Sequence, residues 1–342
     1  MLNNRQPILI TGGAGFIGSN FIKYYLGKRE DIHIVNLDKL TYAANLESLS
    51  AFEREQNYSF VQGDICDSTL VDGLFKEYGI SSVIHFAAES HVDNSIERPA
   101  DFIKTNIEGT FTLLQVAKHH WLEKASGQSI KNAHKFHHIS TDEVYGSLGE
   151  EGSFDETYPY APNSPYSASK AAADFLVRSY HHTYGLNTVV SNCSNNYGPH
   201  QHGEKLIPTI IRKALAEEPI PIYGDGKNVR DWLYVEDHCR ALELVFEKGK
   251  SGETYAVGGN CEKTNLELAK NICSILDKKV PRNEGCYAEL ITFVKDRPGH
   301  DFRYAINSSK IQGTLGWKPN EDLQSGLEKT IDHYIKKYAT KI

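Results

Sequence analysis

The chain has 342 residues, with 44 acidic against 37 basic side chains and a formal net charge of −7 at pH 7. Its composition, 40% hydrophobic and 24% charged, is that of an ordinary globular protein, and its length allows one large domain or two modest ones. The acidic balance argues against general nucleic-acid binding. An anionic ligand would therefore need a local cluster of Arg and Lys.

The chain shows no sign of membrane insertion or secretion. No apolar run approaches the roughly 20 residues that a membrane-spanning helix needs. Residues 1–7 are polar and lack the core of a signal peptide, so we expect a cytoplasmic protein. Six cysteines are scattered without a Cys-x-x-Cys pair, which is typical of reduced thiols rather than a disulfide framework or a zinc site.

Apolar runs of strand length alternate with amphipathic stretches of helix length through the first two-thirds of the chain. This alternation predicts an α/β fold with a doubly wound parallel sheet. The pattern changes near residue 195, where Gly, Pro and Asn increase. We therefore expect a sheet domain over 1–195 and mainly a smaller mixed α/β substrate lobe over 196–342, with some segments returning to the sheet. The predicted strands are 8–11, 33–37, 59–62, 82–86, 136–140 and 188–192, and the predicted helices include 17–26, 100–120 and 167–184.

A glycine-rich turn follows the first predicted strand and opens the first predicted helix. Glycines there allow the backbone to approach a pyrophosphate, and the helix N-terminus supplies amide donors. A tight turn without a ligand is the alternative. Because the context is that of a Rossmann domain, residues 1–195 are predicted to bind a dinucleotide. The residues of the turn are Gly12, Gly13, Gly15, Phe16, Ile17 and Gly18.

Acidic and small residues at later strand ends fit the same cofactor. Asp38 ends the second strand, where it would bond both ribose hydroxyls and repel a 2′-phosphate, so NAD is favoured over NADP. The neighbouring Lys39 would offset part of that repulsion. Asp64 and Ile65 follow the third strand and would meet the adenine, although a turn-capping Asp explains the position equally well. Small residues after the fourth strand leave room for the dinucleotide, namely Ala87, Ala88 and Ser90.

Thr141-Asp142-Glu143, followed by Tyr166-x-x-x-Lys170, is the most informative pattern. Tyr and Lys four residues apart lie on one face of a helix. A nearby ammonium favours the phenolate, so the Tyr can act as a base near neutral pH and take a proton from a sugar hydroxyl. The adjacent carboxyl groups add an acid–base pair that a simple dehydrogenase does not need. The pattern predicts oxidation, elimination of water and reduction on one nucleotide-sugar, whereas a helix cap after the fifth strand is the alternative for residues 140–143.

Together these motifs resemble the extended short-chain dehydrogenase/reductase family over nearly the whole chain. The resemblance is carried by residues 11–18, Tyr166-x-x-x-Lys170, residues 195–199 and residues 230–237. Within that family the sequence is similar to the nucleotide-sugar 4,6-dehydratases, through residues 38–42, 140–146 and 296–301. The resemblance implies a redox-neutral lyase that retains NAD and acts on a nucleoside-diphosphate glucose, with dTDP-glucose expected.

The implied chemistry divides among five residues. Tyr166 would take the proton of the C4 hydroxyl while the C4 hydride moves to NAD. Lys170 would lower the pKa of Tyr166 and bind the nicotinamide ribose, and Thr141 would align the reacting oxygens. Glu143 would then remove the C5 proton while Asp142 protonates the departing C6 hydroxyl. Two neighbouring carboxyl groups can divide base and acid roles if their surroundings separate their pKa values.

The resemblance also implies the remaining contacts. Arg suits a diphosphate, although Arg230 and Arg297 each adjoin an Asp, so a surface ion pair is the alternative. The helices 100–120 and 167–184 would pair with a second copy to form a homodimer. Further cofactor contacts are expected at Leu40, Thr41, Thr105, Tyr166, Lys170 and Asn196. Substrate contacts are expected at Ser90, Thr141, Asn195, Lys205, Leu206, Ile207, Pro221, Ile222, Tyr223, Arg230, Asn265, Arg297 and His300.

Other functions remain as alternatives. A sugar-nucleotide 4-epimerase needs Tyr166 and Lys170 but has no work for Asp142 and Glu143. A UDP-glucose 4,6-dehydratase is a second alternative, because a methyl group on the base is worth only about 1–3 kcal/mol in a pocket. An NAD-consuming dehydrogenase and a non-catalytic dinucleotide sensor are the others. The paired histidines lack the cysteine or carboxylate cluster of a metal site, so we predict no metal.

Overall fold

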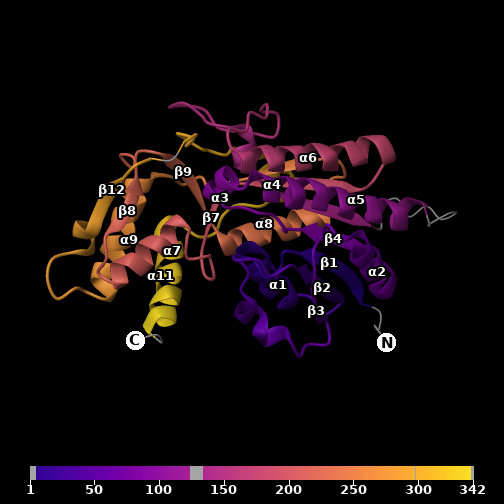
Figure 1. Cartoon of the computed structure of the whole chain (residues 1–342), viewed down its shortest axis with the longest axis horizontal. Helices are drawn as coiled ribbons and strands as arrows, with labels where there is room; N and C mark the ends of the chain where they lie inside the picture. Colours follow the sequence, from indigo (N-terminus) through magenta and orange to yellow (C-terminus); the bar gives the residue numbers. More distant parts are fainter. Residues whose placement is uncertain (1–4, 124–133, 297, 340–342) are drawn as a thin grey trace.

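The computed structural model describes residues 5–123, 134–296 and 298–339, and its largest feature is a seven-stranded sheet (Figure 1). The strand order is β10-β6-β5-β4-β1-β2-β3, and every neighbouring pair is parallel. This is the order of a Rossmann fold extended by one strand. The strands are β1 (Gln6–Thr11), β2 (Ile32–Asp38), β3 (Tyr58–Gln62), β4 (Ser82–His85), β5 (Lys135–Thr141), β6 (Thr188–Cys193) and β10 (Thr254–Val257).

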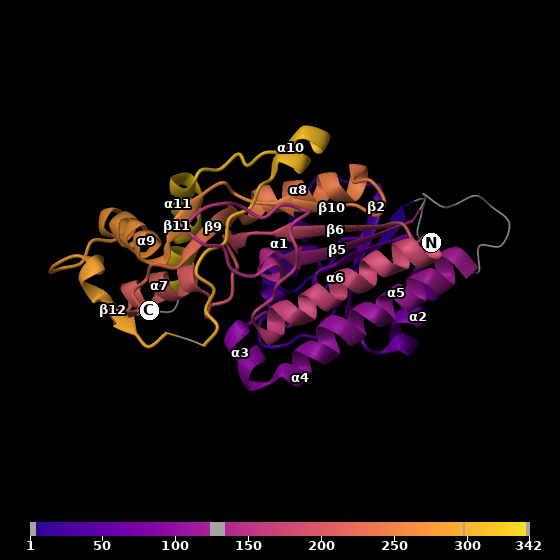
Figure 2. The same cartoon turned by 90° about the horizontal axis from the view of Figure 1, so that it is seen from above.

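Helices cover both faces of the sheet. Because successive side chains of a strand point to opposite faces, Leu9 packs with helices α2 (Ser68–Tyr78), α5 (Thr110–Lys118) and α6 (Pro165–Tyr184). Its neighbours Ile8 and Ile10 pack with α1 (Phe16–Leu26) and α8 (Val235–Lys248) on the other face. Figure 2 shows α5 and α6 running side by side along one face. The doubly wound sheet predicted from the sequence is confirmed.

All six predicted strands are present, and their ends differ from the prediction by two residues or fewer. The sequence did not predict the seventh, β10, which lies beyond residue 195 and pairs with β6. The polar segment 124–135 is typical of a surface loop between a helix and the fifth strand. Most of it lies outside the described residues, and Lys135 already belongs to β5.

The helix predicted at 100–120 is helical but not uniform. It consists of α4 (Pro99–Phe102), a π-helical segment η2 (Ile103–Gly109), α5 and a second π-helical segment η3 (His119–Glu123). π-Helical turns are rare and often lie at functional sites. Here the segment brings Asn106 against the loop after β4, as described below.

The second lobe has its own sheets and core, and in Figure 1 it lies beside the large sheet. One sheet joins β7 (Asn195–Tyr197), β9 (Val229–Tyr234) and β11 (Glu262–Thr264), and the other pairs β8 (Ile220–Tyr223) with β12 (Ile291–Val294). Its larger helices are α7 (Leu206–Leu215), α9 (Asn265–Lys279) and α11 (Leu323–Ala339). The short helices of the chain are η1 (Leu46–Phe52), α3 (Val92–Glu97), η4 (Asp142–Tyr145), η5 (Tyr287–Leu290) and α10 (Ser309–Leu315).

None of the described helices is both long enough and apolar enough to cross a membrane.

Candidate active site

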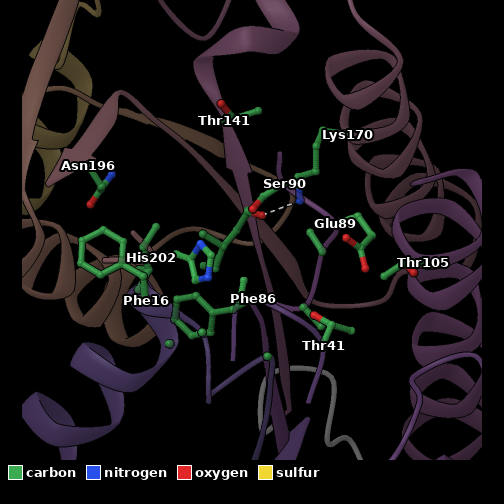
Figure 3. A pocket seen from close by; sticks show the side chains of 18 of the residues that line it. Phe16, Thr41, Phe86, Glu89, Ser90, Thr105, Thr141, Lys170, Asn196 and His202 are labelled. Atoms are coloured by element: carbon green, nitrogen blue, oxygen red, sulfur yellow. Dashed lines mark hydrogen bonds between the residues drawn. The ribbon is translucent and has the colours of Figure 1, made fainter. Parts of the chain in front are cut away.

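The main cleft lies at the carboxyl ends of the parallel strands, where ligands bind in doubly wound folds. It extends from the turn after β1 to the start of α6, and residues of the second lobe complete one side. In Figure 3, Phe16, Asn196 and His202 lie on one side of the cleft, and Lys170, Glu89 and Thr105 lie on the other. One cleft therefore joins the predicted cofactor residues to the predicted catalytic residues.

The glycine-rich turn has no room for side chains. Gly12 has a positive φ of 72°, and a Cβ there would lie 2.6 Å from the backbone of Ala87. A Cβ on Gly18 would lie 2.4 Å from the carbonyl oxygen of Gly12. The N-terminus of α1 can therefore pack directly against the turn, as a pyrophosphate cradle requires.

Asp38 is held at the end of β2 by backbone amides. Its two carboxylate oxygens accept hydrogen bonds from Ala14 N at 2.9 Å and Leu40 N at 2.8 Å. The ammonium of Lys39 instead pairs with Asp64 at 2.8 Å. Lys39 is therefore engaged away from Asp38, whose charge stays available to bind ribose hydroxyls and repel a 2′-phosphate. Asp64 also accepts a hydrogen bond from Cys66 N, so it caps its turn as well as lining the cleft.

The loop after β4 is fixed by an amide side chain from the π-helical segment. Asn106 accepts a hydrogen bond from Glu89 N at 2.9 Å and donates to Glu89 O at 3.0 Å. It also donates to Ser169 Oγ at 2.8 Å, beside Lys170 on α6. This clamp fixes the small residues that line the cofactor cleft.

The second lobe closes over the cleft through residues 199–205. Lys205 Nζ donates to Ser90 O at 3.1 Å, and the ring of His202 meets the ring of Tyr42 edge to face at 5.6 Å. Pro199 O accepts a hydrogen bond from Asn20 on α1. We call residues 199–205 the strap, because they connect the second lobe to both sides of the cofactor cleft.

Helix α6 presents Tyr166 and Lys170 to the cleft. The helix starts with a capping box between Ser164 and Ser167 and has Pro165 in its first turn, both strong N-terminal signals. Lys170 Nζ donates to Ile139 O at 2.8 Å, which fixes the ammonium against the end of β5. The predicted one-face arrangement of Tyr and Lys is thus present.

Burial dominates the protonation of both groups. It lowers the pKa of Lys170 to about 8. Burial raises the pKa of Tyr166 well above its usual value, the carboxylate of Glu143 raises it further, and a hydrogen bond with Thr141 lowers it. The sequence suggested that Lys170 keeps the phenol acidic, but in the folded protein burial is the largest influence on the pKa of Tyr166, and it raises that pKa.

The paired carboxyl groups have different surroundings. Asp142 is buried, and its Oδ2 has no hydrogen-bond partner among the described residues. Burial raises the pKa of Asp142 well above its usual value, and the charges of Glu143 and Asp231 raise it further. Burial therefore favours the protonated form of Asp142, whereas Glu143 is only partly buried, and both side chains line the cleft. Thr141 Oγ1 also accepts a hydrogen bond from Glu143 N, so the segment caps a short helix while lining the cleft.

Most predicted cofactor and catalytic residues line this cleft, as do Ser90, Asn195 and Lys205 from the substrate set. Gly13 and Leu40 support it from outside its lining. Predicted substrate residues that do not line it are Leu206, Ile207, Pro221, Ile222, Tyr223, Arg230, Asn265 and His300. Arg297 lies outside the described residues.

These remaining residues divide between the core of the second lobe and its surface. Ile207 and Ile222 belong to the hydrophobic core, whereas Tyr223 is exposed. His300 pairs with Asp296 at 2.7 Å and meets the ring of Tyr223 at 6.4 Å. His300 and Tyr223 therefore lie together in the second lobe.

Arg230 is buried rather than part of a surface ion pair. Its guanidinium donates to Val229 O at 2.7 Å and Asp301 O at 2.9 Å and lies over the ring of Tyr304. The neighbouring Asp231 accepts hydrogen bonds from the amides of Gly259 and Cys261.

Several lining residues were not predicted. They include Phe86, Glu89, Cys193, Gln201, His202 and Glu204. Phe86 and Glu89 are next to predicted residues in the chain, so the sequence pattern after the fourth strand could have identified them. Gln201, His202 and Glu204 of the strap carry no such signal, because only the tertiary fold brings them over the cleft.

Comparison with known proteins places these features in context. Residues 9–330 match the family model described as GDP-mannose 4,6 dehydratase. The chain is 55% identical to dTDP-glucose 4,6-dehydratase of Xanthomonas campestris pv. campestris over 328 residues, which cover 96% of this chain and 92% of the relative. It is also 55% identical to the Salmonella typhimurium dTDP-glucose 4,6-dehydratase over 339 residues, with 96% and 93% coverage.

Solved structures of proteins with the same name as these relatives are also similar to this chain. The dTDP-glucose 4,6-dehydratase of Bacillus anthracis in complex with NAD has a TM-score of 0.86 at 43% identity, and 98% of each chain is covered. The Streptomyces venezuelae enzyme of the same name, with NAD bound, has a TM-score of 0.88 at 41% identity and the same coverage. A UDP-glucose 4-epimerase of Thermotoga maritima shares the fold, with a TM-score of 0.84, at only 28% identity over 97% of this chain and 100% of that one.

Proposed function

The chain belongs to the GDP-mannose 4,6-dehydratase family of extended short-chain dehydrogenases/reductases, and from its site we infer an NAD-dependent dTDP-glucose 4,6-dehydratase. The product is dTDP-4-keto-6-deoxyglucose. The observation that carries this function is the pair of carboxyl groups, Asp142 buried and Glu143 more open, in one cleft with Tyr166 and Lys170. An epimerase has no step for that pair, so the epimerase alternative is not favoured.

The cleft fits NAD on its own geometry. The turn around Gly12 leaves space for a pyrophosphate, and Asp38 stands where the adenosine ribose would lie. Bound NAD supplies the acceptor for the C4 hydride of the sugar and the donor that returns it to C6. We propose that Lys170 anchors the nicotinamide ribose while Thr105 and Asn196 line the remaining walls.

For the first step, we propose that Tyr166 takes the proton of the C4 hydroxyl. Thr141, whose side chain forms a hydrogen bond with Tyr166, would align the C4 oxygen of the sugar with the phenol. The ammonium of Lys170 stabilises the phenolate as it forms. General acid–base catalysis of this kind is worth about 10²–10⁴-fold in rate.

For the elimination, we propose that Glu143 removes the C5 proton, which the C4 ketone makes acidic. Asp142, whose protonated form burial favours, would donate a proton to the C6 hydroxyl, which leaves as water. The two roles need separated pKa values, and the different exposure of the two groups supports that separation.

We propose that residues 1–195 hold the cofactor and the catalytic groups, while most of 196–342 holds the nucleotide part of the substrate. Asn195 and Lys205 line the shared cleft and would meet the sugar diphosphate. Of the other proposed contacts, Tyr223, Arg230 and His300 belong to the second lobe or its loops, and Arg297 is proposed from the resemblance alone. The cytoplasmic location expected from the sequence stays a prediction.

We also propose a homodimer formed by the helices from α4 to α6. Three large apolar side chains stand exposed there, Ile103 at 56%, Phe111 at 44% and Phe175 at 56%. A neighbouring copy would remove this surface from water. Sedimentation of the protein at micromolar concentration should give a dimer, and a monomer there would reject the proposal.

The function can be tested with dTDP-glucose carrying deuterium at C4, with no cofactor added. Mass spectrometry and NMR should find the label at C6 of a 4-keto-6-deoxy product. Unchanged sugar or the 4-epimer would reject the function. UDP-glucose, run in parallel, should react much more slowly, and an equal rate would favour the UDP-glucose alternative.

A further inference from the structure

A buried carboxylate lies behind the active site, one helical turn after Lys170. Asp174 is 4% exposed, on the side of α6 that faces the sheet. It connects α6 to strands β5 and β6 and to the segment before α6. Its Oδ2 accepts three hydrogen bonds, from Ser140 Oγ at 2.8 Å, Tyr160 OH at 2.9 Å and Asn192 Nδ2 at 3.1 Å.

The other oxygen of Asp174, Oδ1, makes no hydrogen bond among the described residues, and it faces Lys170 across a histidine. His138 Nε2 lies 3.2 Å from Asp174 Oδ1 and 3.4 Å from Lys170 Nζ. Burial lowers the pKa of His138 to about 4, so the imidazole is neutral at physiological pH. A neutral imidazole at this position separates the carboxylate from the ammonium without adding charge.

A buried ammonium is costly unless an anion compensates it. Two described side chains act electrostatically on Lys170 in the direction that raises its pKa, Asp174 and Cys193. Burial raises the pKa of Cys193 to about 12, so this thiol is neutral. Tyr166 is held as a phenol, and His85, packed against His138 from β4, is neutral because burial lowers its pKa. Asp174 is therefore the group that compensates the charge of Lys170.

We propose that Asp174 is the counter-ion of Lys170 and acts across His138 as a positioning residue, which keeps the ammonium charged at its place against the end of β5, in the cleft that it shares with Tyr166. The inference rests on the proposed function, because Lys170 serves the first proton transfer. Asp174 itself does not line the cleft, and it would touch neither substrate nor cofactor.

The test is the pH profile of C4 oxidation in the first turnover, followed by the absorbance of the reduced nicotinamide. In Asp174→Asn, the loss of the negative charge lets Lys170 lose its proton at lower pH. The alkaline limb should therefore move to lower pH by about one unit, the lower end of the effect of a close opposite charge. Because the pKa of Lys170 lies at about 8, the rate should fall about 2-fold at neutral pH and about 10-fold at pH 9, with KM for dTDP-glucose unchanged. Asp174→Glu, which keeps the charge, should restore the position of the limb.

Tyr160→Phe is the matched control. It removes one of the three donors to Asp174 Oδ2 but leaves the carboxylate and His138 in place. Its alkaline limb should coincide with that of the wild type. A folded Asp174→Asn with an unshifted limb would overturn the proposal, as would an equal shift in Tyr160→Phe.

A second pair of variants covers the case in which Asp174→Asn does not fold. His138→Leu removes the imidazole between the two charges but leaves the three donors to Asp174 in place, whereas the amide of His138→Gln can accept from the ammonium and donate to the carboxylate. The Leu variant should oxidise substrate about 10-fold more slowly at unchanged KM, with most of the rate restored by Gln. A wild-type rate in the Leu variant rejects the proposal. A wild-type protein that does not oxidise dTDP-glucose at all rejects the proposed function instead.

Discussion

Asp142 and Glu143 are adjacent in the chain, yet Asp142 is only 2% exposed while Glu143 borders the open cleft. Both residues follow β5 at the start of the short helix η4, and both line the cleft, although only Asp142 is enclosed by the fold. One dipeptide therefore supplies a buried carboxyl group and a more accessible one to the same cleft.

Glu143→Gln should separate oxidation from elimination. The variant keeps Tyr166 and Lys170, so mixing with dTDP-glucose should still reduce bound NAD. Product formation should fall by about 10²–10⁴-fold, the usual worth of one general base. Stopped-flow absorbance and product NMR would measure both steps, with the exposed Glu151→Gln as a control. Near-native turnover in Glu143→Gln would show that another group removes the C5 proton.

Gly12→Ala should abolish retention of NAD. The new methyl group would lie 2.6 Å from the backbone of Ala87, in addition to the strain of a positive φ. Gly79→Ala is a matched control, because Gly79 also has a positive φ but nothing lies within 4 Å of its Cβ position. The control should lose only about 1–2 kcal/mol of stability. The NAD content of each purified protein tests this, and equal NAD in both variants would contradict it.

Asp38→Asn should weaken discrimination between NAD and NADP. Removal of the carboxylate charge should improve NADP binding relative to NAD by about tenfold, equivalent to about 1.4 kcal/mol. Lys39→Ala should leave the preference unchanged, since Lys39 pairs with Asp64 rather than with Asp38. Titration of cofactor-stripped protein gives the ratio of Kd values. A larger change in Lys39→Ala than in Asp38→Asn would reverse this interpretation.

Asp142 should also make stability depend on pH. Burial and the charges of Glu143 and Asp231 raise its pKa well above the ordinary value, so the fold favours the protonated form. That stabilisation is present below the unfolded pKa of about 4 and is lost as pH rises through the folded pKa. Asp142→Asn stays neutral and should lose less unfolding free energy at alkaline pH. Denaturant unfolding across pH measures this, and parallel curves for the two proteins would refute it.

Local patterns were sufficient to predict the sheet and the cofactor turn. Strand and helix periodicity located β1 to β6, and the glycine-rich turn around Gly12 could be identified from the residues directly before and after it. The four residues of β10 carry no comparable signal, because their place beside β6 depends on the whole fold.

The sequence predicted site residues only where they form a motif of residues close together in the chain. Tyr166 and Lys170 lie on one helix face, so their spacing was sufficient. Asp174 lies one further turn along the same helix, but its donors come from β5, β6 and the segment before α6. Likewise, a sequence pattern does not show that the Arg230 guanidinium is directed at backbone carbonyls.

The strap has a consequence for how the protein would depend on its surroundings. Lys205 and His202 connect the second lobe to both sides of the dinucleotide cleft. We expect bound NAD to exchange only when these contacts open, far less often than sugars enter and leave. The rate of sugar conversion would then not depend on the ratio of oxidised to reduced nicotinamide in the cell. It would stay constant when the respiratory state of the cell changes.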